Sequence, residues 1–317
     1  MYKITTVIPT YKRPRELRRC LSSVGAQLHR ADQVIIVVKH DDAPTQATLH
    51  DFQSRLPLTI VTVTQPGQVH ALNAGLDAAD GDVVAITDDD AAPRPDWLAR
   101  IAAHFAADPD LGGLGGRDWV HQPDGRLEDG GRRRVGKVQW FGRIIGNHHL
   151  GVGGPRVVDL LKGANMSYRR TAIAGLRFDA RLRGQGAQVH NDMAFSMAVK
   201  RRGWKLVYDP AVAVDHYLAP RADIDQRGVF HPEATENAAF NLLCATQTQL
   251  TGWKRWSTRQ WQVWVGTSGE PGSLAYLRAA TTGGRHAKER YAAARRGRGT
   301  AEAASDALMQ AKEDRGS

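Results

Sequence analysis

Short apolar segments alternate with amphipathic segments through the first 107 residues of the chain. The apolar segments have the length and β-branched content of buried strands, and the others place apolar residues at helical spacing. The predicted strands are residues 3–9, 34–38, 58–64 and 83–87. The predicted helices are residues 15–28, 45–55, 69–79 and 97–107. This alternation predicts right-handed β-α-β units, and therefore an α/β fold with a mostly parallel, Rossmann-like sheet flanked by helices.

The carboxyl ends of these four strands are all polar or turn-forming. They comprise residues 9–11, 39–42, 64–67 and 88–90. Ligands of open parallel sheets bind in the crevice at the carboxyl ends of the strands. The sequence therefore predicts one binding crevice lined by these four segments.

Three consecutive carboxylates, Asp88, Asp89 and Asp90, follow the fourth strand. Carboxylates crowded at the end of a buried strand repel one another unless a cation neutralises them. Mg²⁺ or Mn²⁺ bridging a diphosphate would do so, because these ions combine one or two carboxylates with phosphate oxygens. The alternative is an aspartate-rich turn that caps the next helix, with Pro93 or Pro95 near its first turn.

Composition excludes several classes of protein. A chain that is 42% hydrophobic and 24% charged folds, so wholesale disorder is excluded. Its two cysteines, Cys20 and Cys244, form no disulfide framework and suit a reducing compartment. The first residues lack the apolar core of a signal peptide, so we expect a cytoplasmic protein. The net charge of +10 suits a phosphorylated substrate or an anionic membrane, whereas basic clusters without interleaved aromatic residues disfavour nucleic acid.

The remainder of the chain divides into three regions. Residues 112–154 are rich in Gly, Arg and His, and we expect a hairpin or a mobile loop on the acceptor side. Helical and strand patterns resume at 193–202 and 205–208. We therefore expect a catalytic domain over residues 1–220 and a helical, tryptophan-rich, basic extension over 221–317.

Four tryptophans of the extension recur at spacings of three, five and three: Trp253, Trp256, Trp261 and Trp264. Such a pattern is more typical of core packing than of a sugar platform or a membrane belt. The basic run from Arg278 to Arg298 makes docking on an anionic inner membrane leaflet the second interpretation.

Six sequence elements together resemble those of family 2 glycosyltransferases with the GT-A fold. The resemblance covers about residues 3–217, with the elements in the order found in that family. They are Val7-Ile8-Pro9-Thr10-Tyr11-Lys12-Arg13; Asn73-Ala74-Gly75-Leu76 with Ala79-Asp80-Gly81-Asp82; Asp88-Asp89-Asp90; residues 163–170, beginning Gly163-Ala164-Asn165; Asn191-Asp192 with Arg202-Gly203-Trp204; and Asp209-Pro210 with His216.

The resemblance implies a role for each matching residue. Asp90, with Asp88 and His216, would bind Mn²⁺ or Mg²⁺, and Asp88 or Asp89 would reach the ribose of the donor. His216 is otherwise a capped or core histidine. The residues expected to border the nucleotide sugar are Pro9, Thr10, Tyr11, Arg13, Lys39, Asp41, Asp42, Gly67, Asn73, Asp88 and Asp89. Those expected on the side of the donor sugar or acceptor are Gly163, Ala164, Asn165 and Asn191.

Asp192 is the candidate catalytic base. A carboxylate within reach of the acceptor hydroxyl can remove its proton as the anomeric carbon is attacked, which implies single-displacement inversion. Its alternative role is an N-cap of the following helix. The chain departs from the family pattern at Asn191, where an acidic neighbour is usual, and over residues 38–45, which leave the nucleobase open. Processive members carry Q-x-x-R-W, whereas this chain has Gly252-Trp253-Lys254-Arg255-Trp256, so processive polymerisation is not expected.

These features favour a non-processive glycosyltransferase. The expected donor is a UDP-sugar, with GDP and dTDP as alternatives, and the expected acceptor is a hydroxyl of a surface polysaccharide or glycolipid, including a lipid-linked one. A nucleotidyltransferase on a similar sheet is one alternative, but its glycine-rich phosphate loop is missing because residues 9–13 hold no glycine. The other alternative is a non-catalytic protein that binds nucleotide, lipid or nucleic acid.

Overall fold

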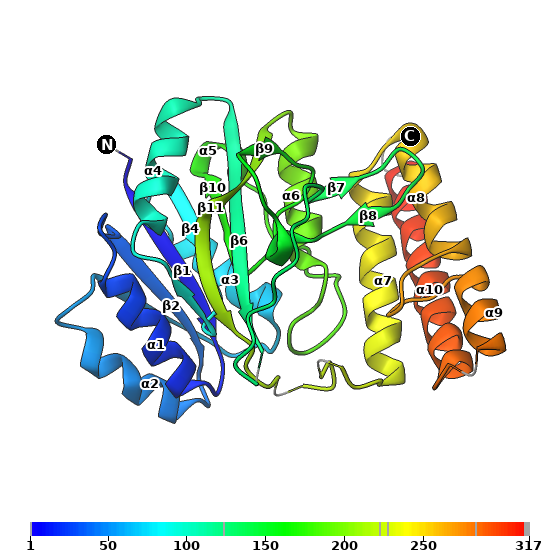
Figure 1. Cartoon of the computed structure of the whole chain (residues 1–317), viewed down its shortest axis with the longest axis horizontal. Coiled ribbons are helices and arrows are strands. Elements are labelled where there is room, and N and C mark those ends of the chain that lie inside the picture. The colour runs from blue at the N-terminus through cyan, green and yellow to red at the C-terminus, as the bar shows by residue number, and fades with distance from the viewer. Residues whose placement is uncertain (1, 123, 222, 227, 283, 314–317) are drawn as a thin grey trace. The chain divides into compact units, whose positions relative to one another are not determined.

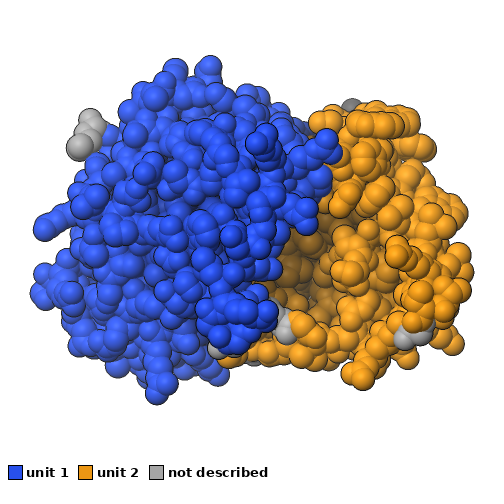
Figure 2. All heavy atoms as spheres, viewed as in Figure 1, with its two compact units in different colours: residues 1–137, 145–178, 195–219 blue, residues 138–144, 179–194, 220–317 orange. Residues whose placement is uncertain are grey.

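The chain folds into two compact units. The structure is a computed structural model that describes residues 2–122, 124–221, 223–226, 228–282 and 284–313 (Figure 1). Unit 1 consists of residues 1–137, 145–178 and 195–219, and unit 2 of residues 138–144, 179–194 and 220–317 (Figure 2).

Unit 1 is built on a sheet with nine strands among the described residues, in the order β3-β2-β1-β4-β10-β6-β11-β5, with β9 beside β11. The strands are β1 (Ile4–Thr10), β2 (Gln33–Lys39), β3 (Leu58–Val63), β4 (Val83–Ile86), β5 (Ala91–Pro93), β6 (Leu111–His121), β9 (Arg156–Val157), β10 (Met166–Arg169) and β11 (Lys205–Tyr217). The first four strands in the order are parallel, as are β6 and β11, whereas β10, β5 and β9 run antiparallel to their neighbours. The predicted α/β fold with a mostly parallel sheet is confirmed.

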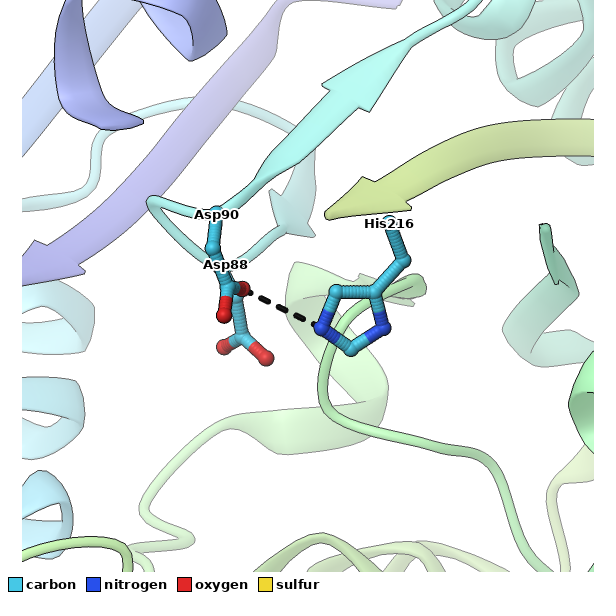
Figure 3. A group of neighbouring side chains, drawn as sticks. All are labelled: Asp88, Asp90 and His216. Carbon is cyan, nitrogen blue, oxygen red and sulfur yellow. Dashed lines mark ion pairs between the residues drawn. The ribbon is translucent and has the colours of Figure 1, made fainter. Parts of the chain in front are cut away.

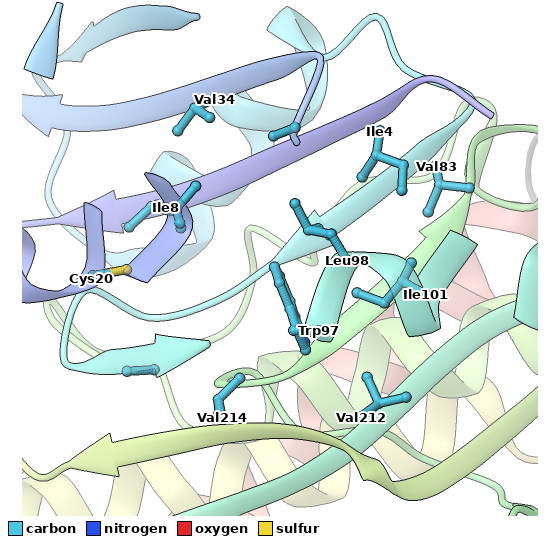
Figure 4. Close-up of a cluster of buried hydrophobic side chains, with 14 of the residues drawn as sticks. Ile4, Ile8, Cys20, Val34, Val83, Trp97, Leu98, Ile101, Val212 and Val214 are labelled. Atoms are coloured by element: carbon cyan, nitrogen blue, oxygen red, sulfur yellow. The ribbon is translucent and has the colours of Figure 1, made fainter. Parts of the chain in front are cut away.

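Helices pack on both faces of this sheet, which explains the continuous apolar strands. Alternate residues of β1, Ile4 and Ile8 against Val7, belong to two separate buried clusters. The cluster drawn in Figure 4 includes Trp97 and Leu98 of α4. The helices that start in unit 1 are α1 (Pro14–Gly25), α2 (Ala43–Leu49), α3 (Gln68–Ala78), α4 (Trp97–Ala107) and α5 (Arg170–Ile173), with 3-10 turns η1 (His50–Phe52) and η2 (His148–Leu150).

Two predicted helices end earlier than their apolar spacing suggested. The first ends at Gly25, so Leu28 lies beyond it and is 78% exposed rather than buried. The second ends at Leu49 and continues as the 3-10 turn η1. The apolar periodicity therefore identified these helices correctly but not their last residues.

The expectation of a loop beginning at residue 112 is wrong, because residues 111–121 form the long strand β6 inside the sheet. Its glycines lack apolar side chains of their own, and the space above them is filled by neighbours. A Cβ at Gly112 would lie 2.4 Å from Trp204 Cβ, and one at Gly116 would lie 1.5 Å from the carbonyl oxygen of Val212. The glycine run is thus a sign of close packing rather than of a turn. A small hairpin, β7 (Lys137–Val138) and β8 (Ile144–Ile145), does occur within the expected excursion.

Unit 2 is mainly helical. Its helices are α7 (Pro232–Gln249), α8 (Gly252–Trp264), α9 (Ser273–Thr281) and α10 (Ala287–Glu313), and α6 (Asn191–Arg201) starts in it and continues into unit 1. Phe240 and Leu243 of α7 are buried, as are Ala293 and Ala294 of α10. Gly297 of α10 lies so near α7 that a Cβ there would meet the carbonyl oxygen of Glu236 at 2.1 Å. None of the described helices combines the length and hydropathy that crossing a bilayer requires.

The core-packing interpretation of the tryptophans is wrong for three of the four. Trp253, Trp256 and Trp264 are 58%, 53% and 53% exposed, whereas Trp261 is half-buried and contacts the ring of Phe141.

We predict that Gly116→Ala destabilises the protein by about 1–3 kcal/mol, because the new methyl group meets backbone atoms that cannot move aside. The free energy of unfolding in urea measures this loss. Gly299→Ala is the matched control: its Cβ would meet nothing within 4 Å, and alanine is the better helix former, so stability should rise slightly. Equal effects of the two substitutions would contradict the packing account of β6.

Candidate active site

The carboxyl ends of β1 and β4, which are neighbours in the sheet, bring several of the expected site residues together. Asp88, Asp89 and Asp90 lie in the loop between β4 and β5. Thr10 Oγ1, from the end of β1, donates a hydrogen bond of 2.8 Å to Asp89. Gln68, at the start of α3, donates one of 3.3 Å to Asp88. Of the four segments predicted to converge, residues 9–11 are therefore joined directly to residues 88–90, and the start of α3 is joined to the same aspartates.

Asp88, Asp90 and His216 form the chemical centre of this site (Figure 3). Each of the three offers one ligand atom, and these atoms all lie within 4.8 Å of one another. Asp90 and His216 are 1% and 3% exposed, and their Oδ1 and Nε2 atoms are 3.2 Å apart. Two carboxylates and an imidazole gathered in this way are suitable ligands for Mn²⁺.

Strand register brings His216 to the aspartates although the chain separates them widely. β5 pairs antiparallel with the end of β11, and His216 stands opposite Ala91. Because Ala91 follows Asp90 directly, the histidine lies beside that carboxylate. The N–H of Tyr217 also donates to the Asp90 carbonyl at 2.9 Å, and the N–H of Ala219 donates to the Asp90 carboxylate at 3.1 Å.

A second buried carboxylate, Asp118 of β6, holds the other side of the His216 ring. Its Oδ2 lies 3.3 Å from His216 Nδ1 and forms a salt bridge with Lys162. An Nδ1–H donated to a carboxylate leaves Nε2 as the ligand atom, which is the usual arrangement around a metal-bound histidine. Nε2 is fully buried, and the neighbour that the structure gives it is Asp90 Oδ1 at 3.2 Å. This combination fits a divalent ion held by Nε2 with Asp90 and Asp88.

The electrostatics of the ion-free site reflect the same arrangement. Burial alone would lower the pKa of His216, but Asp118 and Asp90 raise it to about 9. Burial would raise the pKa of Asp90, yet the His216 imidazole outweighs burial and holds it well below its usual range. In the ion-free site, the protonated imidazole of His216 therefore supplies the positive charge between the two carboxylates.

Asp89 is buried and hydrogen-bonded to other side chains of the protein. It is 3% exposed, and Arg13 Nη1 donates to it at 2.8 Å. Burial raises the pKa of Asp89 to about 7, with Arg13 opposing and Asp90 adding to the rise. Because Thr10 and Arg13 occupy its oxygens, Asp88 is the better placed of the two expected ribose contacts.

The end of β2 contributes cations and a cap. Lys39 Nζ lies 5.1 Å from the centre of the Tyr11 ring, and Lys12 Nζ lies 5.0 Å from it. Lys39 also pairs with Asp41 at 3.2 Å. Asp42 is 1% exposed and caps α2 by accepting the N–H of Thr45 at 3.3 Å. Of the two aspartates left open by the sequence, Asp41 is the more exposed and Asp42 stabilises the helix.

Two of the residues expected to contact the ligands use their side-chain amides in hydrogen bonds within the protein. Asn73 both donates to and accepts from the backbone of Phe178, at 3.0 and 2.8 Å. Asn165 accepts the indole N–H of Trp97 at 2.9 Å and donates to the Val212 carbonyl at 2.8 Å.

The other expected contacts have backbone roles. Pro9 belongs to β1, where it stands opposite Val37 of β2. Gly67 precedes α3 with a φ of 103°, a conformation that favours glycine. The carbonyl of Ala164, which follows Gly163, accepts the Thr87 hydroxyl at 2.9 Å.

Asn191 and Asp192 belong to unit 2, at the first turn of α6. The Asn191 amide donates to the carbonyls of Ala187 and Gln188, at 3.0 and 3.1 Å. Asp192 Oδ1 accepts the N–H of Met193 at 2.7 Å. A carboxylate in the first turn of a helix also meets the positive end of the helix dipole.

Asp118 and Lys162 are the site residues that sequence reasoning missed. Asp118 fell within the region expected to be a loop, and Lys162 precedes the Gly163-Ala164-Asn165 segment directly. A carboxylate just after the glycine run was the available signal, but it points to the site only once β6 is known to lie beside β11.

Comparisons with known proteins agree with this geometry. The family model described as Glycosyl transferase family 2 matches residues 5–175. The glucosyl-dolichyl phosphate glucuronosyltransferase of Haloferax volcanii is 24% identical over 228 residues, covering 68% of this chain and 69% of that protein. A glycosyltransferase of Nostoc sp. is 35% identical over 105 residues, covering 32% of this chain and 33% of its own length.

Solved structures show the same fold. The mannosyltransferase PcManGT of Pyrobaculum calidifontis, in complex with GDP-Man and Mn²⁺, matches with a TM-score of 0.56 and 18% identity, covering 93% of this chain and 87% of that one. TarS 1–349 of S. aureus, in complex with UDP-GlcNAc, matches with a TM-score of 0.55 and 16% identity, covering 80% and 69%.

A mostly parallel sheet with an Asp-Asp-His cluster at its strand ends defines an α/β protein of the GT-A class. Because the family model matches more than half of its residues, the chain belongs to glycosyl transferase family 2.

We predict that the ion-free protein loses stability as pH rises through about 9. The folded-state pKa of His216 lies above its ordinary value of 6.5, so its contribution is complete below about pH 6.5 and disappears above about pH 9. A loss on the order of 2 kcal/mol should appear in urea unfolding between pH 6 and 9.5 with EDTA present. His216→Gln should flatten this dependence, whereas His50→Gln, at an exposed histidine of η1, should retain it. An unchanged slope in His216→Gln would rule out the buried ion pairs.

Proposed function

We propose that this chain is a metal-dependent, non-processive, inverting glycosyltransferase that moves a sugar from a nucleoside-diphosphate sugar to a hydroxyl acceptor. The observation that carries the proposal is the buried His216, whose Nε2 faces Asp90 while its Nδ1 is held by Asp118. Asp88 completes the ligand set. The family membership supplies the reaction class.

Different residues of the site would bind different parts of the donor. Asp88, Asp90 and His216 would hold Mn²⁺ or Mg²⁺, which when bound neutralises charge on the diphosphate leaving group. Tyr11, with Lys12 and Lys39 beside its ring, offers an aromatic face and positive charge at the end of β1. The ion pair of Arg13 with Asp89 would hold the loop after β4 against the start of α1.

Asp192 would act as the base in a single displacement. Its role requires a carboxylate held in one orientation. The hydrogen bond from the Met193 N–H supports this condition, because it restrains the side chain. Non-processive transfer is supported by Gly252, which stands where processive members carry glutamine.

The comparisons suggest donor and acceptor classes. One solved neighbour was crystallised with GDP-Man and Mn²⁺ and another with UDP-GlcNAc, so UDP and GDP are the first donors to test, with UDP favoured and dTDP as the third. The relative that acts on glucosyl-dolichyl phosphate suggests a lipid-linked acceptor in polysaccharide or glycolipid assembly. Both cysteines are buried and unbridged, which suits the cytoplasm, and the protein would work peripherally at the inner membrane face.

Donor binding is testable by thermal shift with UDP, GDP, dTDP, CDP and ADP, each with Mn²⁺ or with EDTA. We expect one nucleotide to raise the melting temperature only when metal is present, because a ligand at a hundredfold excess over its dissociation constant adds about 2.7 kcal/mol to stability. Asp90→Asn should lose the shift, whereas Asp77→Asn, at an exposed aspartate of α3, should keep it. The absence of any shift in the unmodified protein would contradict the proposed site.

Catalysis by Asp192 predicts a separation of binding from turnover. Asp192→Asn should lower kcat by about 10²–10⁴-fold while the thermal shift with donor nucleotide and Mn²⁺ persists. Proton NMR of the product formed by the unmodified enzyme should show an anomeric configuration opposite to that of the donor. Retained configuration, or full activity in Asp192→Asn, would remove Asp192 from the role of base.

A further inference from the structure

Helix α8 of unit 2 has three buried polar residues and three exposed tryptophans. The buried residues of α8 are Ser257, Thr258 and Gln262. Trp253, Trp256 and Trp264 of the same helix are each more than half exposed. Large aromatic side chains gathered on an exposed face are uncommon in soluble proteins and mark a surface that meets a partner.

The orientation of α8 is fixed by its neighbours. Gln262 Nε2 donates to Thr246 Oγ1 of α7 at 3.0 Å. Gly142, in the segment between β7 and β8, lies so close that a Cβ there would meet the carbonyl oxygen of Ser257 at 2.1 Å. A rotation that buried the tryptophans would break the first contact and create a clash at the second. The outward direction of the indoles is therefore set by the fold of unit 2.

Trp140 extends this exposed face from a distant part of the sequence. It lies between β7 and β8 and is 70% exposed. Its carbonyl oxygen accepts the indole N–H of Trp253 at 2.9 Å, and the rings of Trp253 and Trp256 are 4.7 Å apart. We call Trp140, Trp253 and Trp256 the tryptophan surface. Trp264 lies three turns further along the same face of α8, about 16 Å away.

The two segments that carry the tryptophan surface contain charged side chains of one sign only. Neither residues 138–144 nor α8 contains an aspartate or glutamate. Arg143 and Lys254 are exposed, and neither forms a salt bridge with any described residue. Arg259, by contrast, is engaged by Glu302 at 2.7 Å. Indoles with neighbouring cations and no carboxylates match the headgroup region of a bilayer that contains anionic lipid.

We propose that the tryptophan surface docks unit 2 on an anionic lipid interface, with Arg143 and Lys254 facing the lipid phosphates. This deepens the proposed function by naming the surface and the lipid class, and it rests on that function only for the purpose of docking. A second copy fits less well, because two identical cationic surfaces repel each other. Nucleic acid fits less well too, because indoles outnumber exposed cations, whereas binding along a phosphate backbone depends on many cations.

Vesicle flotation tests the inference with the full chain. The protein should float with phosphatidylcholine vesicles that contain phosphatidylglycerol, and much less with phosphatidylcholine alone. The double variant Trp140→Ala/Trp256→Ala should bind roughly tenfold or more weakly, because it removes two large apolar side chains. Lys254→Gln should weaken binding about fivefold, which corresponds to about 1 kcal/mol per charge near the surface. Brominated lipids should quench the tryptophan fluorescence of the unmodified protein.

Two controls separate docking from misfolding and from failure of the catalytic proposal. Leu28→Ala removes an exposed apolar side chain of unit 1 and should float normally. Each variant should keep its melting temperature and the metal-dependent nucleotide shift, so loss of flotation alone locates the defect in docking. Flotation with the unmodified protein but no nucleotide shift would reject the catalytic proposal and leave docking standing.

Three results would overturn the inference. The first is failure of the unmodified protein to float, or equal flotation with neutral vesicles. The second is a concentration-dependent dimer in sedimentation that Trp256→Ala abolishes, which would assign the surface to a second copy. The third is tight binding of a single-stranded oligonucleotide that the double variant loses, without any binding of vesicles.

Discussion

The site depends on a balance of buried charge around His216. Asp89, Asp90 and Asp118 are each at most 3% exposed, and three carboxylates in such an environment would be prohibitively costly if left alone. Each has its own cation: Arg13 bonds Asp89, Lys162 bonds Asp118, and the imidazole lies between Asp118 and Asp90. In the ion-free protein, the proton on His216 compensates the negative charge of Asp90 and Asp118. A divalent ion at Nε2 would replace that proton. The site is therefore organised before any ligand arrives.

The order and pairing of the strands hold these charged residues together. β5 has only three residues, yet it ties the aspartate loop to the end of β11, so the loop cannot shift without breaking strand pairs. β6 runs parallel to β11 and delivers Asp118 to the other side of the imidazole. A substitution that displaces β6, as a side chain at Gly116 would, thus reaches Asp118 and His216 through packing alone. Fold stability and ligand geometry are coupled through the same three strands.

The N-terminal half of unit 1 was predictable because its strands are buried on both faces and read as continuous apolar runs. β6 was not, because its apolar surroundings come from Trp204, Tyr168 and Leu206 rather than from its own glycines. The aspartates and His216 were identified from the sequence, but Asp118 and Lys162 required knowledge of strand register. Conversely, Asn73 and Asn165 match the family pattern, yet Asn73 is bonded to the backbone of Phe178 and Asn165 to the Trp97 indole. A residue that matches the pattern can therefore make a structural hydrogen bond rather than a ligand contact.

The exposure of the tryptophans of α8 could not be predicted from their spacing in the sequence. Their spacing suits a buried face and an exposed face equally well, and the decision comes from Gln262 and Gly142, whose contacts lie far away in sequence. Indoles exposed in this number would favour aggregation in a neutral protein. Here the two segments that carry them contain cations and no carboxylates, a charge that disfavours pairing of two copies and favours an anionic surface. The cations of these segments thus both disfavour self-association and favour burial of the indoles in an anionic interface.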